Sequence, residues 1–241
     1  MPGRAFIALG NFLFRVRNGL FPLLVPLVLL PGRPLAAEPL RAVLAGLLIA
    51  AAGQLVRVAT IGLRYIIRGG RNRRIYAEDL VTEGLYAHSR NPMYVGNLLI
   101  MTGVAVASNC LTTVAVAVPL FLLVYFAITA AEEDFLRHRF GAVFDDYCRA
   151  VPRFLPRLAG IKATLRSMSF RWRRVIVKEY GTPFGWLSII YLLALWLTWR
   201  PRHSFSGHEG FRNAVFVIMV ITTTLWATAL VLKRSRRLVA D

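Results

Sequence analysis

Two runs without a charged side chain constrain the fold of this chain more than any other feature. Leu111–Ala131 has 21 residues and Asn213–Leu232 has 20. As helices rising about 1.5 Å per residue, both are long enough to cross a hydrocarbon core of about 30 Å. The chain has 241 residues, of which 56% are hydrophobic, which is more than an ordinary soluble domain carries. The sequence therefore predicts a polytopic helical membrane protein.

Four further apolar stretches bring the predicted number of spans to about six. Met93–Ser108 and Gly185–Trp199 are uncharged over 16 and 15 residues. Pro39–Ile67 is longer but contains three arginines, and Ala5–Leu30 joins two shorter apolar segments. The N-terminal stretch also resembles a signal peptide, and Leu35–Ala37 offers a cleavage site, but none follows the apolar run directly. We expect a retained span and an all-α fold with cytoplasmic interfacial helices between the spans.

The net charge of +18 is concentrated on alternate connections between the predicted spans. Basic residues gather in Arg4–Arg17, Arg57–Arg74, Arg137–Lys178 and Lys233–Arg237. This positive-inside pattern predicts a multi-pass protein with both termini cytoplasmic, in a bacterial inner membrane or an internal membrane. Anionic lipids of the inner leaflet are the expected partners of these residues. Aromatic residues lie in the spans instead of among the basic runs, so the charge does not indicate nucleic-acid binding.

Three segments follow from this pattern. Residues 1–67 form the N-terminal transmembrane helices, 68–158 form a core with a helical hairpin, and 159–241 form a basic interfacial segment followed by two spans. Cys110 and Cys148 fall on opposite sides of the predicted membrane, so we expect no disulfide.

The core segment contains nearly all the residues suited to chemistry. We expect a structured loop over Glu78–Tyr86, and a helix that begins at Asn91-Pro92, where Asn caps the free amides and Pro suits the first turn. The chain then turns near Asn109 and returns. From Glu132 the pattern becomes amphipathic, which predicts a helix lying at the cytoplasmic interface.

That interfacial helix is expected to break at Gly141 and to end at Val151–Pro156. Ile161–Lys178 is a second basic amphipathic stretch, which we also place on the inner leaflet.

The hairpin brings the start of its first helix and the pair Glu132-Glu133 to the same membrane face. A carboxylate at this depth favours an ammonium group. Arg90 and the free amides of a helix start favour an anionic group. Tyr86 and Tyr94 add flat faces and hydroxyls. The sequence therefore predicts one polar pocket for a zwitterionic ligand.

These residues resemble a known family. The motifs that carry the resemblance are Gly84-Leu-Tyr86, Arg90-Asn-Pro-Met-Tyr-Val-Gly96, Glu132-Glu133, Phe140-Gly141, Tyr147 and Val151-Pro-Arg-Phe-Leu-Pro156. In order and spacing they are similar to the integral-membrane methyltransferases, which include isoprenylcysteine carboxyl methyltransferase and phosphatidylethanolamine N-methyltransferase. The resemblance covers about ninety residues. It implies a helical enzyme that uses S-adenosylmethionine in a cytoplasmic pocket, with no metal, and it leaves the oligomeric state open.

The resemblance also implies roles for individual residues. The implied cofactor-binding residues are Leu80, Val81, Tyr86, Asn91, Pro92, Met93, Tyr94, Glu132 and Glu133, and the implied catalytic residues are Arg90 and Glu132. Two departures bear on the acceptor, which is a lipid or an isoprenoid compound in this superfamily. Asn91 replaces the His of the carboxyl-methylating branch, and Ile128 replaces its substrate-binding Arg. Both favour a lipid amine over a prenylcysteine carboxylate.

Two other functions remain as alternatives. A sterol-reductase-like oxidoreductase would bind NADPH and has a segment similar to Tyr147-Cys-Arg149, but the two adjacent acids would repel a phosphate-rich cofactor. A transporter or membrane scaffold is the other alternative. It would be expected to show inverted repeats and ionisable residues in mid-span, and the sequence shows neither.

Overall fold

The computed structural model describes residues 3–64, 75–198 and 209–235, and within these ranges the structure is helical, without a strand. The elements are α1 (Arg4–Leu24), the 3-10 helix η1 (Val25–Leu29), α2 (Pro39–Leu63), the 3-10 helix η2 (Gly84–Ala87), α3 (Pro92–Ala107), α4 (Leu111–Phe140), α5 (Ala142–Ala150), α6 (Ile161–Ser167), α7 (Trp172–Glu179), α8 (Gly181–Thr198) and α9 (Glu209–Arg234). The basic residues of the predicted loop at 68–74 lie outside the described residues.

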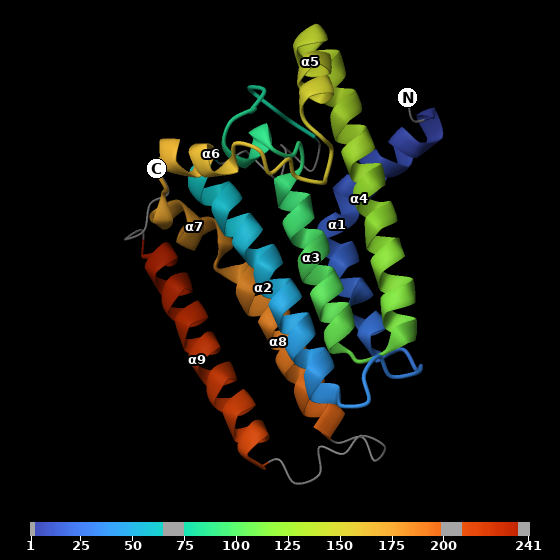
Figure 1. Cartoon of the computed structure of the whole chain (residues 1–241), viewed down its shortest axis with the longest axis vertical. Coiled ribbons are helices and arrows are strands. Elements are labelled where there is room, and N and C mark those ends of the chain that lie inside the picture. The colour runs from blue at the N-terminus through green and yellow to red at the C-terminus, as the bar shows by residue number, and fades with distance from the viewer. Residues whose placement is uncertain (1–2, 65–74, 199–208, 236–241) are drawn as a thin grey trace.

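Five of these helices are long and apolar enough to cross a membrane. They are α1 continued by η1, α2, α4, α8 and α9, and α3 is a shorter apolar helix beside them (Figure 1). The predicted all-α, multi-pass architecture is therefore confirmed. The turn between α3 and α4 is also where the sequence places it, with Asn109 at a φ of +50° and its side chain hydrogen-bonded to the backbone of Ala36.

Glycines allow α2 and α3 to pack closely along their length. Gly46 and Gly53 on α2 face Gly103 and Gly96 on α3, at the same seven-residue spacing. A Cβ atom on Gly103 would lie 2.5 Å from the carbonyl oxygen of Gly46, and one on Gly53 would lie 2.6 Å from that of Gly96. Membrane helices associate through such small residues because lipid supplies no hydrophobic driving force between them. This α2–α3 pair is the centre of the bundle.

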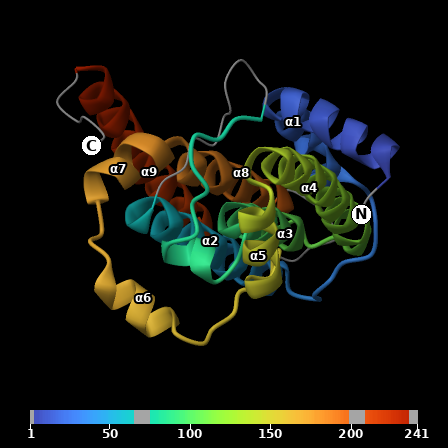
Figure 2. The same cartoon turned by 90° about the horizontal axis from the view of Figure 1, so that it is seen from above.

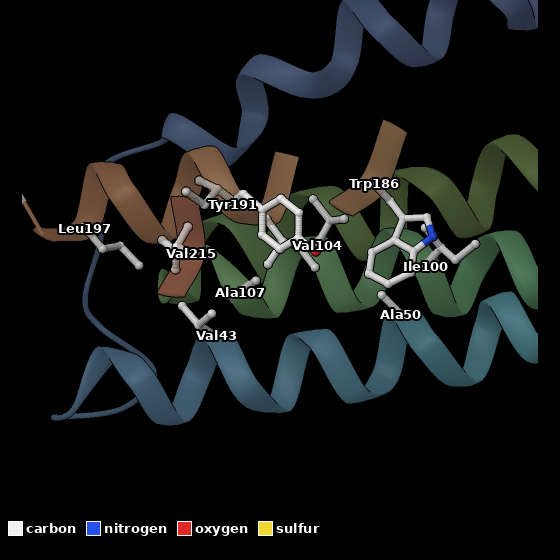
Figure 3. Packing of buried hydrophobic residues seen from close by; sticks show 12 residues of the cluster. Val43, Ala50, Ile100, Val104, Ala107, Trp186, Tyr191, Leu197 and Val215 are labelled. Atoms are coloured by element: carbon white, nitrogen blue, oxygen red, sulfur yellow. The ribbon is translucent and has the colours of Figure 1, made fainter. Parts of the chain in front are cut away.

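The remaining spans pack around this pair. In the same way, Gly10 on α1 contacts the backbone of Ala127 on α4. Helix α8 also packs on the α2–α3 pair, where Trp186 lies against Ala50 of α2 and Ile100 of α3 (Figure 3). Helix α9 lies outermost against α8 and is mostly exposed along its length, as expected of a helix that faces lipid (Figure 1).

One end of the bundle carries most of the non-spanning structure. Helices α5, α6 and α7 gather there, together with the loop before α3, the start of α1 and the end of α9 (Figure 1). One expectation was wrong at this end. Residues Glu132–Phe140 form no separate interfacial helix but continue α4, which runs unbroken for 30 residues. The break comes at Gly141, as predicted, with a φ of +57° that a residue with a Cβ adopts only with strain.

Candidate functional site

The loop before α3 is joined to the loop after α5 by a series of hydrogen bonds. The Arg90 backbone amide donates to the Pro152 carbonyl at 2.9 Å, and Ser89 Oγ donates to the Phe154 carbonyl at 3.0 Å. Tyr147 on α5 donates its hydroxyl to the carbonyl of Tyr86 at 2.7 Å. Burial raises the pKa of the Tyr147 phenol, so this hydroxyl remains a neutral donor. Two motifs about sixty residues apart in the sequence thus form one structural unit.

Glu133 lies inside this unit between two arginines. Its side chain is 9% exposed, and its carboxylate is 2.9 Å from Arg90 Nη2 and 2.9 Å from Arg153 Nε. Arg90 Nη1 also donates to the carbonyls of Cys148 and Val151, at 2.8 and 3.1 Å. Arg90 and Glu133 therefore hold the loop after α5 against the start of α3.

Glu132 has a different set of partners, although it is adjacent in the sequence. The Tyr94 hydroxyl on α3 donates to Glu132 Oε1 at 2.6 Å, and Arg17 Nη1 on α1 donates to the same hydroxyl oxygen at 3.3 Å. The Tyr94 ring packs on Tyr125, with ring centroids 5.0 Å apart. Helices α1, α3 and α4 thus meet around one partly exposed carboxylate.

A cavity of about 930 Å³ opens beside these groups. Its volume lies within the range of small-molecule sites, about 300–1,000 Å³. Its lining includes nine of the residues proposed from the sequence: Leu80, Val81, Tyr86, Arg90, Asn91, Met93, Tyr94, Glu132 and Glu133. Pro92 is buried in the first turn of α3 and does not line the cavity. The structure therefore brings the sequence-predicted residues together, as the hairpin argument requires.

Asn91 acts differently from expectation. It is the N-cap residue of α3, but its side chain makes no capping hydrogen bond. Its Nδ2 donates instead to the Arg153 carbonyl at 3.1 Å, while its own carbonyl accepts from the amides of Tyr94 and Val95. The side chain is directed to the loop after α5 because that loop lies directly against the start of α3.

A second polar cluster, which was not predicted from the sequence, lies at the cavity. Arg57 on α2 donates to both carboxylate oxygens of Glu179 on α7, and also to Asn97 on α3 and Thr182 on α8. The side chains of Arg57 and Glu179 are 7% and 2% exposed. Arg57 interrupts an apolar run in the sequence, which is the signal that a buried partner was needed.

Residues 40–143 match the family model described as phospholipid methyltransferase. The matched segment contains the Arg90–Gly96 motif and the Glu132-Glu133 pair, so it covers the centre of the site. This finding confirms the resemblance to the membrane methyltransferase superfamily that the motifs indicated. The part of the chain from α2 to the start of α5 is thus similar to the membrane methyltransferases.

Two curated relatives carry other names. The chain is 34% identical over 104 residues to a nickel-cobalt-cadmium resistance protein of Alcaligenes xylosoxydans xylosoxydans, and 36% identical over 107 residues to a cobalt-zinc-cadmium resistance protein of Cupriavidus metallidurans. Each alignment covers 43% of this chain and 47% of the relative, so the chain spans about half the length of the curated relatives it matches. No solved structure matches the chain.

Proposed function

We propose that this protein transfers a methyl group from S-adenosylmethionine to a membrane-embedded lipid or amphiphile at the cytoplasmic face, with a lipid amine favoured as acceptor. The observation that carries the proposal is the Tyr94–Glu132 contact beside the cavity. It joins the two halves of the family motif at one site, inside the segment that matches the methyltransferase model.

The residues of the cavity fit the proposed cofactor. Glu132 is suited to the ammonium of its methionine part, because its carboxylate borders the cavity and the Tyr94 hydroxyl that donates to it is neutral. Tyr86 and Tyr94 supply aromatic surface for the adenosine or sulfonium part. When bound, S-adenosylmethionine supplies an electrophilic methyl group. The task of the protein is then to align an acceptor lone pair and exclude water.

The other two charged candidates have structural partners, and we assign them positioning roles. Glu133 is neutralised by Arg90 and Arg153, so the ammonium is assigned to Glu132 and not shared between the two acids. Arg90 directs both terminal nitrogens toward Glu133 and the loop after α5. We therefore propose that Arg90 shapes the cavity wall and does not take part in the chemical step.

The environment of Ile128 supports an amine as acceptor. In the carboxyl-methylating branch the corresponding Arg grips the substrate carboxylate. Here Ile128 is fully buried and packs with Phe14 of α1 and Val124 of α4. An apolar cluster at this position offers no contact to a carboxylate.

The basic residues that line the cavity are also compatible with NADPH binding. Its described residues include seven arginines and lysines: Arg17, Arg57, Arg64, Arg90, Arg174, Lys178 and Lys233. The repulsion expected from the two adjacent acids is weaker than the sequence indicated, because Glu133 is neutralised by arginines. NADPH is therefore the competing ligand in the test below.

The names of the relatives suggest a cellular setting for the proposal. If the chain shares a role in resistance to nickel, cobalt, zinc or cadmium, we propose that it acts on the lipids of the membrane that these ions must cross. Cells with the wild-type protein should then tolerate cadmium better than cells with Glu132→Gln.

Calorimetric titration of the purified protein with S-adenosylmethionine and, separately, NADPH tests the cofactor. We expect S-adenosylmethionine to bind, and Glu132→Gln to weaken it at least tenfold, because a charged hydrogen bond becomes a neutral one. Asp134→Asn is the matched control, since Asp134 lies two residues further along α4 and does not line the cavity. NADPH binding without S-adenosylmethionine binding would establish the oxidoreductase instead.

The acceptor requires a second measurement. Lipid extracts of cells with wild-type protein and with Glu132→Gln are compared by mass spectrometry. Methylation predicts species heavier by about 14 Da per transfer that are present only with the wild type.

A further inference from the structure

The carboxyl-terminal helices lie beyond the family-matched segment, yet they form part of the cavity. Arg174, Val177 and Lys178 recur at three- and four-residue spacing, so they share one face of α7, and all three line the cavity. Thr182 from α8 and Lys233 from α9 line it as well. Seen from above, α7 and α9 lie on one side of the bundle and α1 and α4 on the other (Figure 2).

This face of α7 is fixed to the core by the Arg57–Glu179 pair. Glu179 directly follows Lys178, and Thr182, which also contacts Arg57, lies in the first turn of α8. Gln54 adds a third contact, because it donates to Glu179 at 3.1 Å and accepts from the Trp186 indole at 3.0 Å. A buried charge pair with satisfied partners specifies one arrangement of the helices that it joins. This face of α7 therefore forms a fixed wall of the cavity.

This wall contributes basic side chains to the cavity. Three cations border the cavity here, Arg174 and Lys178 from α7 and Lys233 from α9. The Lys233 ammonium lies 4.7 Å from the ring centre of Tyr180. Glu179, the last residue of α7, is paired with Arg57. The acidic residues of the lining are Glu132 and Glu133 from α4 and Glu78 and Asp79 from the loop before η2, and of these Glu133 is paired with Arg90 and Arg153.

We propose that α7 and α9 form the acceptor-binding wall, in which Arg174, Lys178 and Lys233 bind an anionic group, a lipid phosphate, beside the amine to be methylated. This inference rests on the proposed function and gives its acceptor a second recognition element. An amphiphile with adjacent cationic and anionic groups would place its amine toward Glu132 and its phosphate toward α7. The wall would thus determine which acceptor binds, whereas the matched core binds the cofactor.

Native mass spectrometry of the full chain in detergent tests the wall with three probes: dioleoyl phosphatidylethanolamine, octadecylamine and inorganic phosphate. Lys178→Glu should weaken phosphatidylethanolamine binding about tenfold through charge reversal, and leave octadecylamine binding unchanged. Arg173→Glu is the matched control, because Arg173 is an exposed residue of the same helix that does not line the cavity. It should change neither affinity.

Three outcomes would overturn the inference. An equal loss in Arg173→Glu would indicate general surface electrostatics, and a parallel loss of octadecylamine would indicate damage to the apolar part of the site. Inorganic phosphate binding as tightly as the lipid would indicate a free-anion site. Titration with S-adenosylmethionine separates the two proposals. Lys178→Glu should bind S-adenosylmethionine as tightly as the wild type does. If the wild type does not bind it, the proposed cofactor is rejected, and the lipid-binding result is interpreted independently.

Discussion

Glu133 accepts hydrogen bonds from Arg153 and an ion-pair contact from Arg90, while its neighbour Glu132 accepts a hydrogen bond from the Tyr94 hydroxyl. Successive residues of a helix point about 100° apart, so the two carboxylates cannot share one environment. One faces the loop after α5, and the other faces α1 and α3. The sequence presents an acid pair, but the fold assigns each acid a separate role.

Glu133→Gln should destabilise the protein more than a change at an exposed ion pair. Removing this carboxylate leaves two cations near the start of α3 without a counter-ion, at an expected cost of about 3–5 kcal/mol. Thermal unfolding in detergent measures the effect. Asp146→Asn is the control, since its pair with Arg149 is exposed and contributes about 1 kcal/mol or less. Equal melting temperatures for the two variants would contradict the structural role of Glu133.

At the scale of elements, the close packing of α2 on α3 depends on four glycines, which have no side chain. The four glycines of this seam let the two backbones approach within contact distance, and that closeness places Arg57 of α2 beside Asn97 of α3. The same approach positions the start of α3, and with it Tyr94, at the cavity. The close packing of α2 on α3 thus determines where the side chains at the cavity lie.

Gly103→Ala should destabilise the bundle by about 1–3 kcal/mol, because the added methyl group meets the α2 backbone and the helices must separate. The control is Gly185→Ala on α8, where an added Cβ meets no atom within 4 Å. Chemical unfolding in detergent compares the two. If Gly185→Ala were the more destabilising change, the α2–α3 seam would not be the critical contact.

At the scale of the whole molecule, Arg57 joins the family-matched core to the carboxyl-terminal helices. Its guanidinium bonds to residues of α3, α7 and α8, so four elements meet at one side chain. A buried pair of this kind fixes relative position more than it adds stability, because desolvation offsets most of the Coulomb attraction. The cavity therefore depends on a contact outside the motif.

The single variants Arg57→Met and Glu179→Leu should each lose about 3–5 kcal/mol, since each leaves a buried charge without its partner. The double variant should recover most of that loss, as apolar side chains replace the pair. A double-mutant cycle by chemical unfolding measures the coupling. Additive losses would show that the two residues act independently.

The sequence by itself determined the helical, membrane-spanning class, the α3–α4 hairpin and nine of the residues that line the cavity. These follow from hydrophobic run length, turn residues and motif order, which are local properties of the chain. Only the tertiary structure decided that Glu132 and Glu133 have different partners, that Asn91 bonds to a distant loop instead of its own helix, and that α7 completes the cavity. Those outcomes depend on contacts between residues 20 to 122 positions apart, and no local pattern encodes such contacts.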